Sequence, residues 1–138
     1  MSGQRLVEID FPAQADSLRG MRGVVADAAR SAGCSQALTE QLVLALDEAC
    51  TNIIRHAYRD NPCGQIVLTI DRRDNQLVFR LRDFAAGVDV ERIRPRKNRA
   101  LRPGGLGMRL IDSIMDSWEF QAPDEGQGNL LTMIRTIG

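Results

Sequence analysis

Hydrophobic residues recur along the chain with two periods, one typical of strands and one typical of helices. Apolar and charged residues alternate over residues 5–11, which predicts a first strand. Spacings of three and four separate the apolar residues of 15–32, and again those of a second segment that reaches Tyr58. Both segments are therefore predicted to be amphipathic helices, and Ser35 or Thr39 can cap the second one.

The second half of the chain has the pattern of two hairpins separated by a long loop and a helix. Residues 65–71 and 76–83 have strand composition and flank a polar turn, which predicts an antiparallel hairpin. Residues 85–103 contain two prolines, six cations and few apolar side chains, which is typical of a functional or mobile loop. The elements expected after this loop are a helix to about Asp116 and strands over 118–121 and 129–136.

This order of elements predicts one α+β domain over residues 1–138. The length and the 43% hydrophobic content suit a single compact core. Helices and strands are segregated along the chain, so we expect a two-layer α/β sandwich. Its sheet would be mixed and mostly antiparallel, with the helices on one face.

Charge and composition argue against several classes of protein. Lys plus Arg equals Asp plus Glu at 18 each, so no overall field would attract nucleic acid or an anionic membrane. The basic loop lacks interleaved aromatic residues, which argues against direct nucleic-acid binding. We see no secretory signal or membrane span, and three cysteines without C-x-x-C spacing indicate neither a disulfide framework nor a zinc site. A cytoplasmic protein is the simplest interpretation.

The second predicted helix carries a polar group with possible chemistry. Glu48 and Asn52 are four residues apart, and Arg55 and His56 follow at the next turn, so the four side chains should project in similar directions. A carboxylate beside an amide oxygen suits Mg²⁺, which prefers oxygen ligands, and Glu48 could instead accept a proton. The alternative is that these residues form only the solvated face of the helix.

Two further candidates lie where loops begin and end. Asp83 ends a predicted strand, where its carboxylate could accept the exocyclic amine of adenine, although an Asp at this place is also a common turn former. Gly104, Gly105 and Gly107 precede a helix, whose free N–H groups could face phosphates, or they form only a flexible turn. The glycine spacing matches neither the Walker phosphate loop nor the dinucleotide fingerprint.

Together these segments resemble the bacterial anti-sigma-factor serine kinases of the GHKL ATPase superfamily. Residues 44–58 are similar to the family's E-A-x-x-N-x-x-x-H-A-Y helix. Residues 83–87 resemble its D-x-G-x-G box, and 104–107 its glycine box at the end of the ATP lid, which would span about 85–104. The similarity covers nearly the whole chain, with the boxes in the family's order.

The resemblance implies roles for individual residues in binding ATP and Mg²⁺. Glu48 would be the general base, Asn52 the Mg²⁺ ligand and Asp83 the adenine contact. Ala85 replaces the first glycine of the D-x-G-x-G box, which is tolerated comfortably only if its φ is negative. The other residues implied in nucleotide binding are Gly87, Arg102, Gly104, Gly105, Leu106 and Gly107, and Arg102 could also belong to a merely solvated loop.

The resemblance also implies a regulatory activity. Such a kinase phosphorylates a serine or threonine of a STAS-domain anti-sigma-factor antagonist, sequesters a sigma factor or another regulator, and is typically a homodimer. One alternative is a regulatory module that binds ATP without phosphotransfer. A second is a histidine-kinase catalytic domain, but His56 is the only histidine and lies in the ATP-site helix.

Overall fold

The computed structural model describes residues 3–61, 63–85, 108–121 and 128–137. These ranges form, in chain order, β1 (Gln4–Pro12), η1 (Ala15–Ser17), α1 (Leu18–Ser31), α2 (Gln36–Asn52), η2 (Ile53–Ala57), β2 (Gln65–Arg73), β3 (Gln76–Asp83), α5 (Met108–Ile114), β4 (Ser117–Gln121) and β5 (Asn129–Thr136). None of the described helices is long and apolar enough to cross a membrane.

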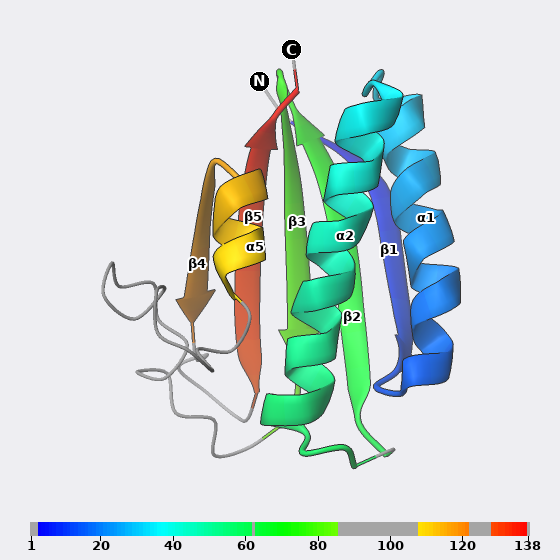
Figure 1. The fold of residues 1–138 in the computed structure, drawn as a ribbon, viewed down its shortest axis with the longest axis vertical. Coiled ribbons are helices and arrows are strands. Elements are labelled where there is room, and N and C mark those ends of the chain that lie inside the picture. The colour runs from blue at the N-terminus through cyan, green and yellow to red at the C-terminus, as the bar shows by residue number, and fades with distance from the viewer. Residues whose placement is uncertain (1–2, 62, 86–107, 122–127, 138) are drawn as a thin grey trace.

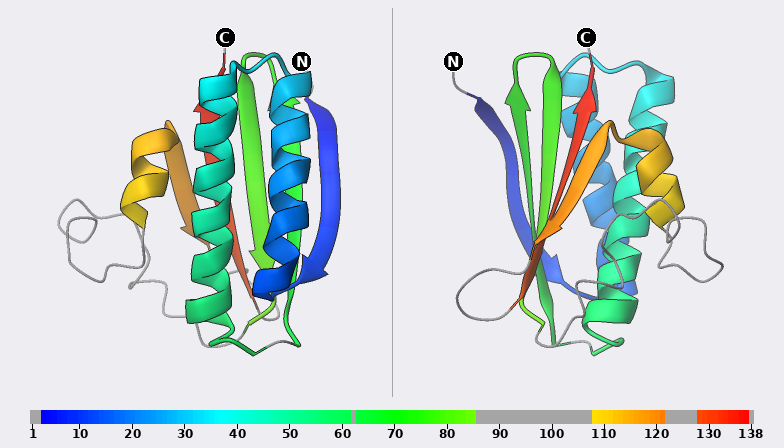
Figure 2. Two further views of the ribbon diagram at one scale, coloured as in Figure 1. Left: turned by 45° about the vertical axis from the view of Figure 1, so that its right-hand side comes forward. Right: turned by 90° about the vertical axis from the view of Figure 1, so that its left-hand side faces the viewer.

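The helices form one layer and the strands the other. Helices α1, α2 and α5 lie on the same face of the sheet, and no described helix lies on the opposite face (Figures 1 and 2). The predicted α+β sandwich with helices on one face is thereby confirmed.

The sheet has the strand order β1-β2-β3-β5-β4. Every described pair of neighbouring strands is antiparallel, so the sheet is antiparallel where a mixed one was expected. The reason is the place of β5. Strand β4 runs in the same direction as β3, but β5 lies between them, so these two strands are not neighbours.

The structure corrects some predicted element boundaries. The segment 15–17 is a 3-10 turn, and the α-helix begins only at Leu18. Ser35 caps α2, because its Oγ accepts a hydrogen bond from the Leu38 N–H at 3.1 Å. Thr39 is no cap, since it lies in the first turn of α2 and is buried.

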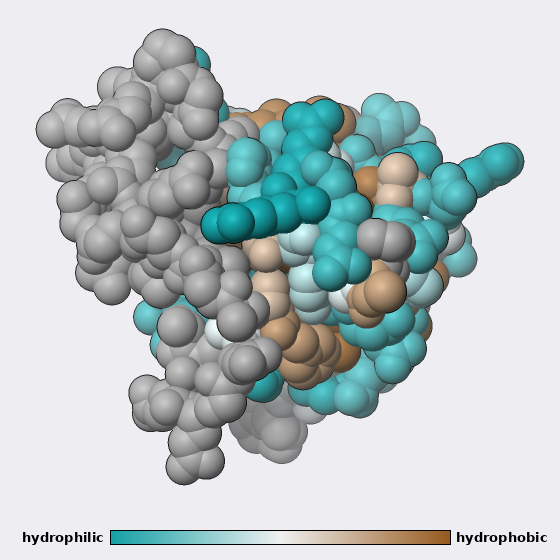
Figure 3. Space-filling view, turned by 90° about the horizontal axis from the view of Figure 1, so that it is seen from below, coloured by the Kyte–Doolittle hydropathy of each residue, from teal (hydrophilic) through white to brown (hydrophobic). Residues whose placement is uncertain are grey.

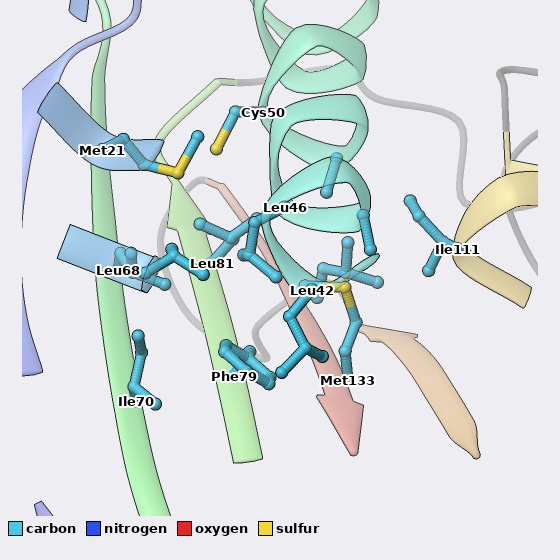
Figure 4. Close-up of a cluster of buried hydrophobic side chains, with 14 of the residues drawn as sticks. Met21, Leu42, Leu46, Cys50, Leu68, Ile70, Phe79, Leu81, Ile111 and Met133 are labelled. Atoms are coloured by element: carbon cyan, nitrogen blue, oxygen red, sulfur yellow. The ribbon is translucent and has the colours of Figure 1, made fainter. Parts of the chain in front are cut away.

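The core fills the space between the two layers. Its largest side chains point toward one another from α1, α2, α5 and the three central strands: Met21, Leu42, Leu46, Leu68, Ile70, Phe79, Leu81, Ile111 and Met133 (Figure 4). Burying one such side chain fully contributes about 1.5–3 kcal/mol. Packing of this layer therefore holds α2, which carries the candidate site, against β3.

The contrast between two leucines of α2 tests this packing. Leu46 is 0% exposed and Leu44 is 51% exposed. We expect Leu46→Ala to lower the free energy of unfolding by about 2–5 kcal/mol, because it removes buried apolar contacts and leaves a cavity. Leu44→Ala, the matched control, should change it by no more than about 0.5 kcal/mol. Urea unfolding followed by circular dichroism measures both, and equal losses would contradict this packing.

Candidate functional site

A cleft opens between the C-terminal half of α2, η2 and the neighbouring ends of β3 and β5. It encloses about 480 Å³, including its open mouth. Its lining is mainly apolar, with Asn52, His56 and Asp83 as polar members, and its other lining residues are Ala49, Ile53, Ala57, Leu81, Met108, Phe120 and Leu131. Figure 3 shows this end of the molecule, where apolar surface lies among hydrophilic residues. A mainly apolar cleft with a few polar groups suits a flat organic ring that has a hydrogen-bonding edge.

Asp83 is the buried polar group of this cleft, with 1% of its surface exposed. Its Oδ1 accepts two hydrogen bonds, each at 3.0 Å, from the side-chain amide of Asn129 and from the backbone N–H of Ala85. Burial raises the pKa of Asp83, and the hydrogen bonds from Asn129 and Ala85 counteract part of that rise. Because a side-chain donor and a backbone donor both bind Oδ1, the carboxylate has a fixed orientation.

The β3–β5 pairing places Asn129 beside Asp83. The two residues are direct partners in the antiparallel register, so their side chains lie on the same face of the sheet. Gly128 makes this approach possible, with a φ of +109°. A Cβ atom at Gly128 would clash with the backbone carbonyl of Asp83. This position therefore requires glycine for both conformation and space.

Tyr58 restrains the segment that follows Asp83 through hydrogen bonds of its hydroxyl group. Its Oη donates to the Gln65 carbonyl at 2.6 Å and accepts from the Phe84 N–H at 2.7 Å. Gly64 lies directly under the Tyr58 ring, where any Cβ atom would overlap the ring carbons. The tyrosine thus joins the end of the second helical segment to the start of β2 and the end of β3.

The second helix changes its winding where it borders the cleft. It is α-helical to Asn52 and continues as the π-helical turn η2, with the Tyr58 N–H bonded to the Ile53 carbonyl. Such wide turns often occur at functional sites. Two residues that were expected to project together lie differently in the structure, because His56 lines the cleft and Arg55 does not.

Asn52 and Glu48 occupy successive turns of α2. The Asn52 amide nitrogen lies 3.6 Å from the Met108 sulfur, a weak contact with α5. This contact leaves the amide oxygen of Asn52 available. Glu48 is half-buried, has no hydrogen bond or ion pair within the described ranges, and does not belong to the cleft lining.

No group of three or more His, Cys, Asp or Glu side chains in the described residues could hold a metal ion by itself. The residues present could hold Mg²⁺ only in the way that proteins usually bind it beside a nucleotide. There it keeps several waters, takes phosphate oxygens and uses one or two protein ligands. Asn52 offers one such oxygen.

The remaining predicted site residues fall into two groups. Gly87, Arg102, Gly104, Gly105, Leu106 and Gly107 lie outside the described residues. Ala85 is described and buried, and it is not among the described non-glycine residues with positive φ. The condition for tolerating alanine in place of glycine is therefore met.

Sequence reasoning missed three residues of the site: Tyr58 as a clamp, Asn129 as the partner of Asp83, and Met108 as the contact of Asn52. The signal for Asn129 was present in principle, because this polar residue follows a glycine and begins a predicted strand whose next two residues are leucines. The contacts of Tyr58 and Met108 span 26 and 56 residues and carry no local signal.

The chain is similar to known proteins in sequence and in fold. The model of the histidine kinase-like ATPase domain matches residues 11–135. A protein named serine-protein kinase RsbW from Bacillus cereus (strain AH820) is 29% identical over 134 residues, which cover 91% of this chain and 82% of that protein. The protein of the same name from Oceanobacillus iheyensis is 29% identical over 124 residues, or 84% of this chain and 78% of that protein.

A solved structure is similar in fold. It is the SiaB–SiaC complex from Pseudomonas aeruginosa, with a TM-score of 0.69 and 12% identity, covering 97% of this chain and 91% of the matched chain. At this identity the likeness shows the fold alone. The family match covers most of the chain, so this protein belongs to the histidine kinase-like ATPase domain family, and within it resembles the anti-sigma-factor serine kinases.

Proposed function

We propose that this protein is an ATP-dependent serine/threonine kinase that acts as a partner-switching regulator in the cytoplasm. It would phosphorylate a STAS-domain anti-sigma-factor antagonist and, as a homodimer, sequester a sigma factor or another regulator. The family match and the similarity to proteins named serine-protein kinases support this proposal. The observation that carries it is the fixed, buried carboxylate of Asp83 in an apolar cleft that Asn52 also lines.

This carboxylate suits the recognition of adenine. The hydrogen bonds from Asn129 and Ala85 both go to Oδ1, so Oδ2 is the atom that would accept from the exocyclic amine. A hydrogen bond to a charged group in a buried site contributes about 1.5–3 kcal/mol. The apolar lining would pack against the faces of the ring.

The phosphates would extend from the adenine toward Asn52. Asn52 would hold Mg²⁺, which neutralises phosphate charge when bound. The residues Gly87, Arg102, Gly104, Gly105, Leu106 and Gly107 are proposed to contact the nucleotide, and their placement lies outside the described residues.

Glu48 would act as the base of the transfer. A serine or threonine hydroxyl of the partner attacks the γ-phosphorus in line, the bond to the β-phosphate oxygen breaks, and ADP leaves. The hydroxyl proton goes to the Glu48 carboxylate. Most of the rate enhancement in such a reaction comes from positioning and charge stabilisation. The competing proposal is a kinase-inactive module that binds ATP and acts by sequestration alone.

The first test is transfer of labelled γ-phosphate from Mg-ATP to a STAS-domain protein encoded beside this one. We expect serine or threonine labelling in the wild type, and a loss of about 100-fold or more in Glu48→Ala through the missing base. Asn52→Ala should lose activity as well, through its Mg²⁺ contact. Glu40→Ala is the matched control, because Glu40 lies on the same helix, is exposed and, within the described residues, accepts a hydrogen bond from Gln36 alone. Tight ATP binding without labelling would favour the kinase-inactive module.

A second test concerns the base that Asp83 recognises. In Asp83→Asn the new amide would turn its oxygen toward the Asn129 and Ala85 donors and its NH₂ toward the adenine amine. We expect ATP binding to weaken about 10- to 100-fold, the equivalent of one charged hydrogen bond. Inosine triphosphate has a carbonyl in place of the amine and can accept from the new NH₂ group. It should therefore bind to the variant more tightly than it binds to the wild-type protein.

Isothermal titration calorimetry with both nucleotides measures this preference. Asp74→Asn is the matched control, since Asp74 lies in the β2–β3 turn with a φ of +54°, a conformation that asparagine tolerates. An unchanged preference between the two nucleotides in Asp83→Asn would remove Asp83 from the adenine site.

A further inference from the structure

The hydroxyl group of Tyr58 lies where the pairing of β2 with β3 ends. The last paired residues are Ile66 and Asp83, so the next pair in the same register would be Gln65 and Phe84. The end of the second helical segment lies at the same end of the molecule as the start of β2 and the end of β3 (Figure 1). Tyr58 therefore contacts both segments at the point where a further ladder bond would form.

The backbone groups of Gln65 and Phe84 belong to a pair that a continued ladder would bond. The Ala13 N–H bonds to the Gly64 carbonyl at 2.8 Å, so this carbonyl points toward the β1 side of β2. Successive residues of an antiparallel strand direct their backbone polar groups to opposite neighbours, so those of Gln65 point toward β3. In a continued ladder the Phe84 N–H would therefore bond to the Gln65 carbonyl.

The Tyr58 oxygen takes the place of that bond. It accepts from the Phe84 N–H at 2.7 Å and donates to the Gln65 carbonyl at 2.6 Å. Gln65 and Phe84 both belong to the described residues, and no direct hydrogen bond joins their backbones. One oxygen atom thus satisfies both backbone groups and separates them, so the β2–β3 ladder stops at Asp83.

The surrounding structure fixes the place of this oxygen. The Tyr58 N–H bonds to the carbonyl of Ile53 at 3.0 Å, and Ile53 lines the cleft. The ring lies against Gly64, where a Cβ atom would come within 2.6 Å of the ring carbons. Between them, Arg59 and Asp60 have φ values of 52° and 63°, a conformation that is uncommon for residues other than glycine. The ring is therefore held on both sides, apart from the bonds of its hydroxyl group.

The end of the ladder permits the turn that orients Asp83. The Ala85 N–H bonds to Oδ1 of Asp83, two residues before it, which is the bond of an Asx turn. Such a turn imitates a β-turn, and Phe84 as its middle residue cannot at the same time extend the strand. The Tyr58 hydroxyl gives the Phe84 N–H a partner that does not require the ladder.

We propose that Tyr58 is a positioning residue that determines the preference of the cleft for a purine with an amine over one with a carbonyl. Its hydroxyl group ends the ladder, and the Ala85 N–H can then hold Oδ1 of Asp83. The oriented Oδ2 accepts from an amine, whereas a carbonyl at the same place would oppose one acceptor to another. The inference rests on the proposed contact of Asp83 with adenine, and it does not depend on phosphotransfer.

Tyr58→Phe tests this role, because it removes one oxygen atom and keeps the ring against Gly64. Isothermal titration calorimetry with ATP and inosine triphosphate gives the ratio of their dissociation constants. We expect the variant to lose about 3- to 10-fold of the wild-type preference for ATP, since the carboxylate keeps only the Asn129 donor. Equal weakening of both nucleotides, with an unchanged ratio, would show a general structural effect and overturn the proposal.

The same substitution in Asp83→Asn provides a test of sign. In that variant the oriented amide turns its NH₂ group to the base, which moves the ratio toward inosine triphosphate. Adding Tyr58→Phe releases the amide from the Ala85 donor, so we expect the ratio to move back toward ATP. Loss of the hydroxyl group thus acts in opposite directions in the two backgrounds, because the residues are coupled. A shift in the same direction in both would contradict an effect through the side chain at position 83.

Ser113→Ala is the matched control. The Ser113 hydroxyl also donates to a backbone carbonyl, that of Leu110 at 2.8 Å, but it lies on the exposed surface of α5. Its removal should leave the ratio at the wild-type value.

Amide hydrogen exchange measured by nuclear magnetic resonance reports on the hydroxyl bridge itself. In Tyr58→Phe the amides of Phe84 and Ala85 should exchange about 10-fold faster or more, whereas Leu81 inside β3 should stay protected. Unchanged exchange at Phe84, or faster exchange along the whole strand, would count against a local role of Tyr58.

The outcomes separate this inference from the proposed function. A wild-type protein that binds neither nucleotide would refute the ATP site, and this inference with it. A changed ratio in Asp83→Asn together with an unchanged ratio in Tyr58→Phe would refute only the role of Tyr58. Phosphotransfer to the STAS-domain protein is measured separately and reports on the kinase.

Discussion

The burial of one carboxylate constrains the rest of this site. A charged group that leaves water without compensation costs several kcal/mol, so Asp83 needs donors at fixed places. The neighbouring strand β5 supplies the Asn129 amide, and the chain just beyond β3 supplies the Ala85 N–H. Strand β5 can approach only because Gly128 lacks a side chain. The position of β5 between β3 and β4 therefore determines the sheet order and also supplies Asn129 to the site.

Much of this fold is predictable from the sequence, because hydrophobic period and turn residues act locally. The limits of β3 and β5 agree with the prediction, and so does the helix layer on one face. The positions of Asn52 and Asp83 in one cleft were implied by the family resemblance, and the structure brings both to its lining. Glu48 lies one turn away, and its role as a base remains a prediction.

Other features could not be predicted, because they arise from contacts between distant segments. The π turn at 53–57 has no distinct composition, and the local sequence does not indicate that His56 lines the cleft while Arg55 does not. The wholly antiparallel sheet depends on which strand becomes the neighbour of β3, and strand composition does not encode that choice. In the sequence Tyr58 is only the end of an apolar stripe. In the structure its hydroxyl group is hydrogen-bonded both to the start of β2 and to the residue after β3.

The register of strand β3 decides which of its side chains lie on each face of the sheet. Asp83 points into the cleft, whereas its neighbours Arg82 and Phe84 lie on the face of the sheet opposite the helices, because successive side chains alternate. A slip of β3 by one residue would place an arginine in the apolar cleft and the carboxylate outside, so the pairings with β2 and β5 fix both surfaces at once. The Tyr58 hydroxyl adds a second restraint, because it holds the Phe84 N–H directly after Asp83. The Phe84 N–H bonded to Tyr58 and the Ala85 N–H bonded to Asp83 therefore belong to one restrained stretch of backbone.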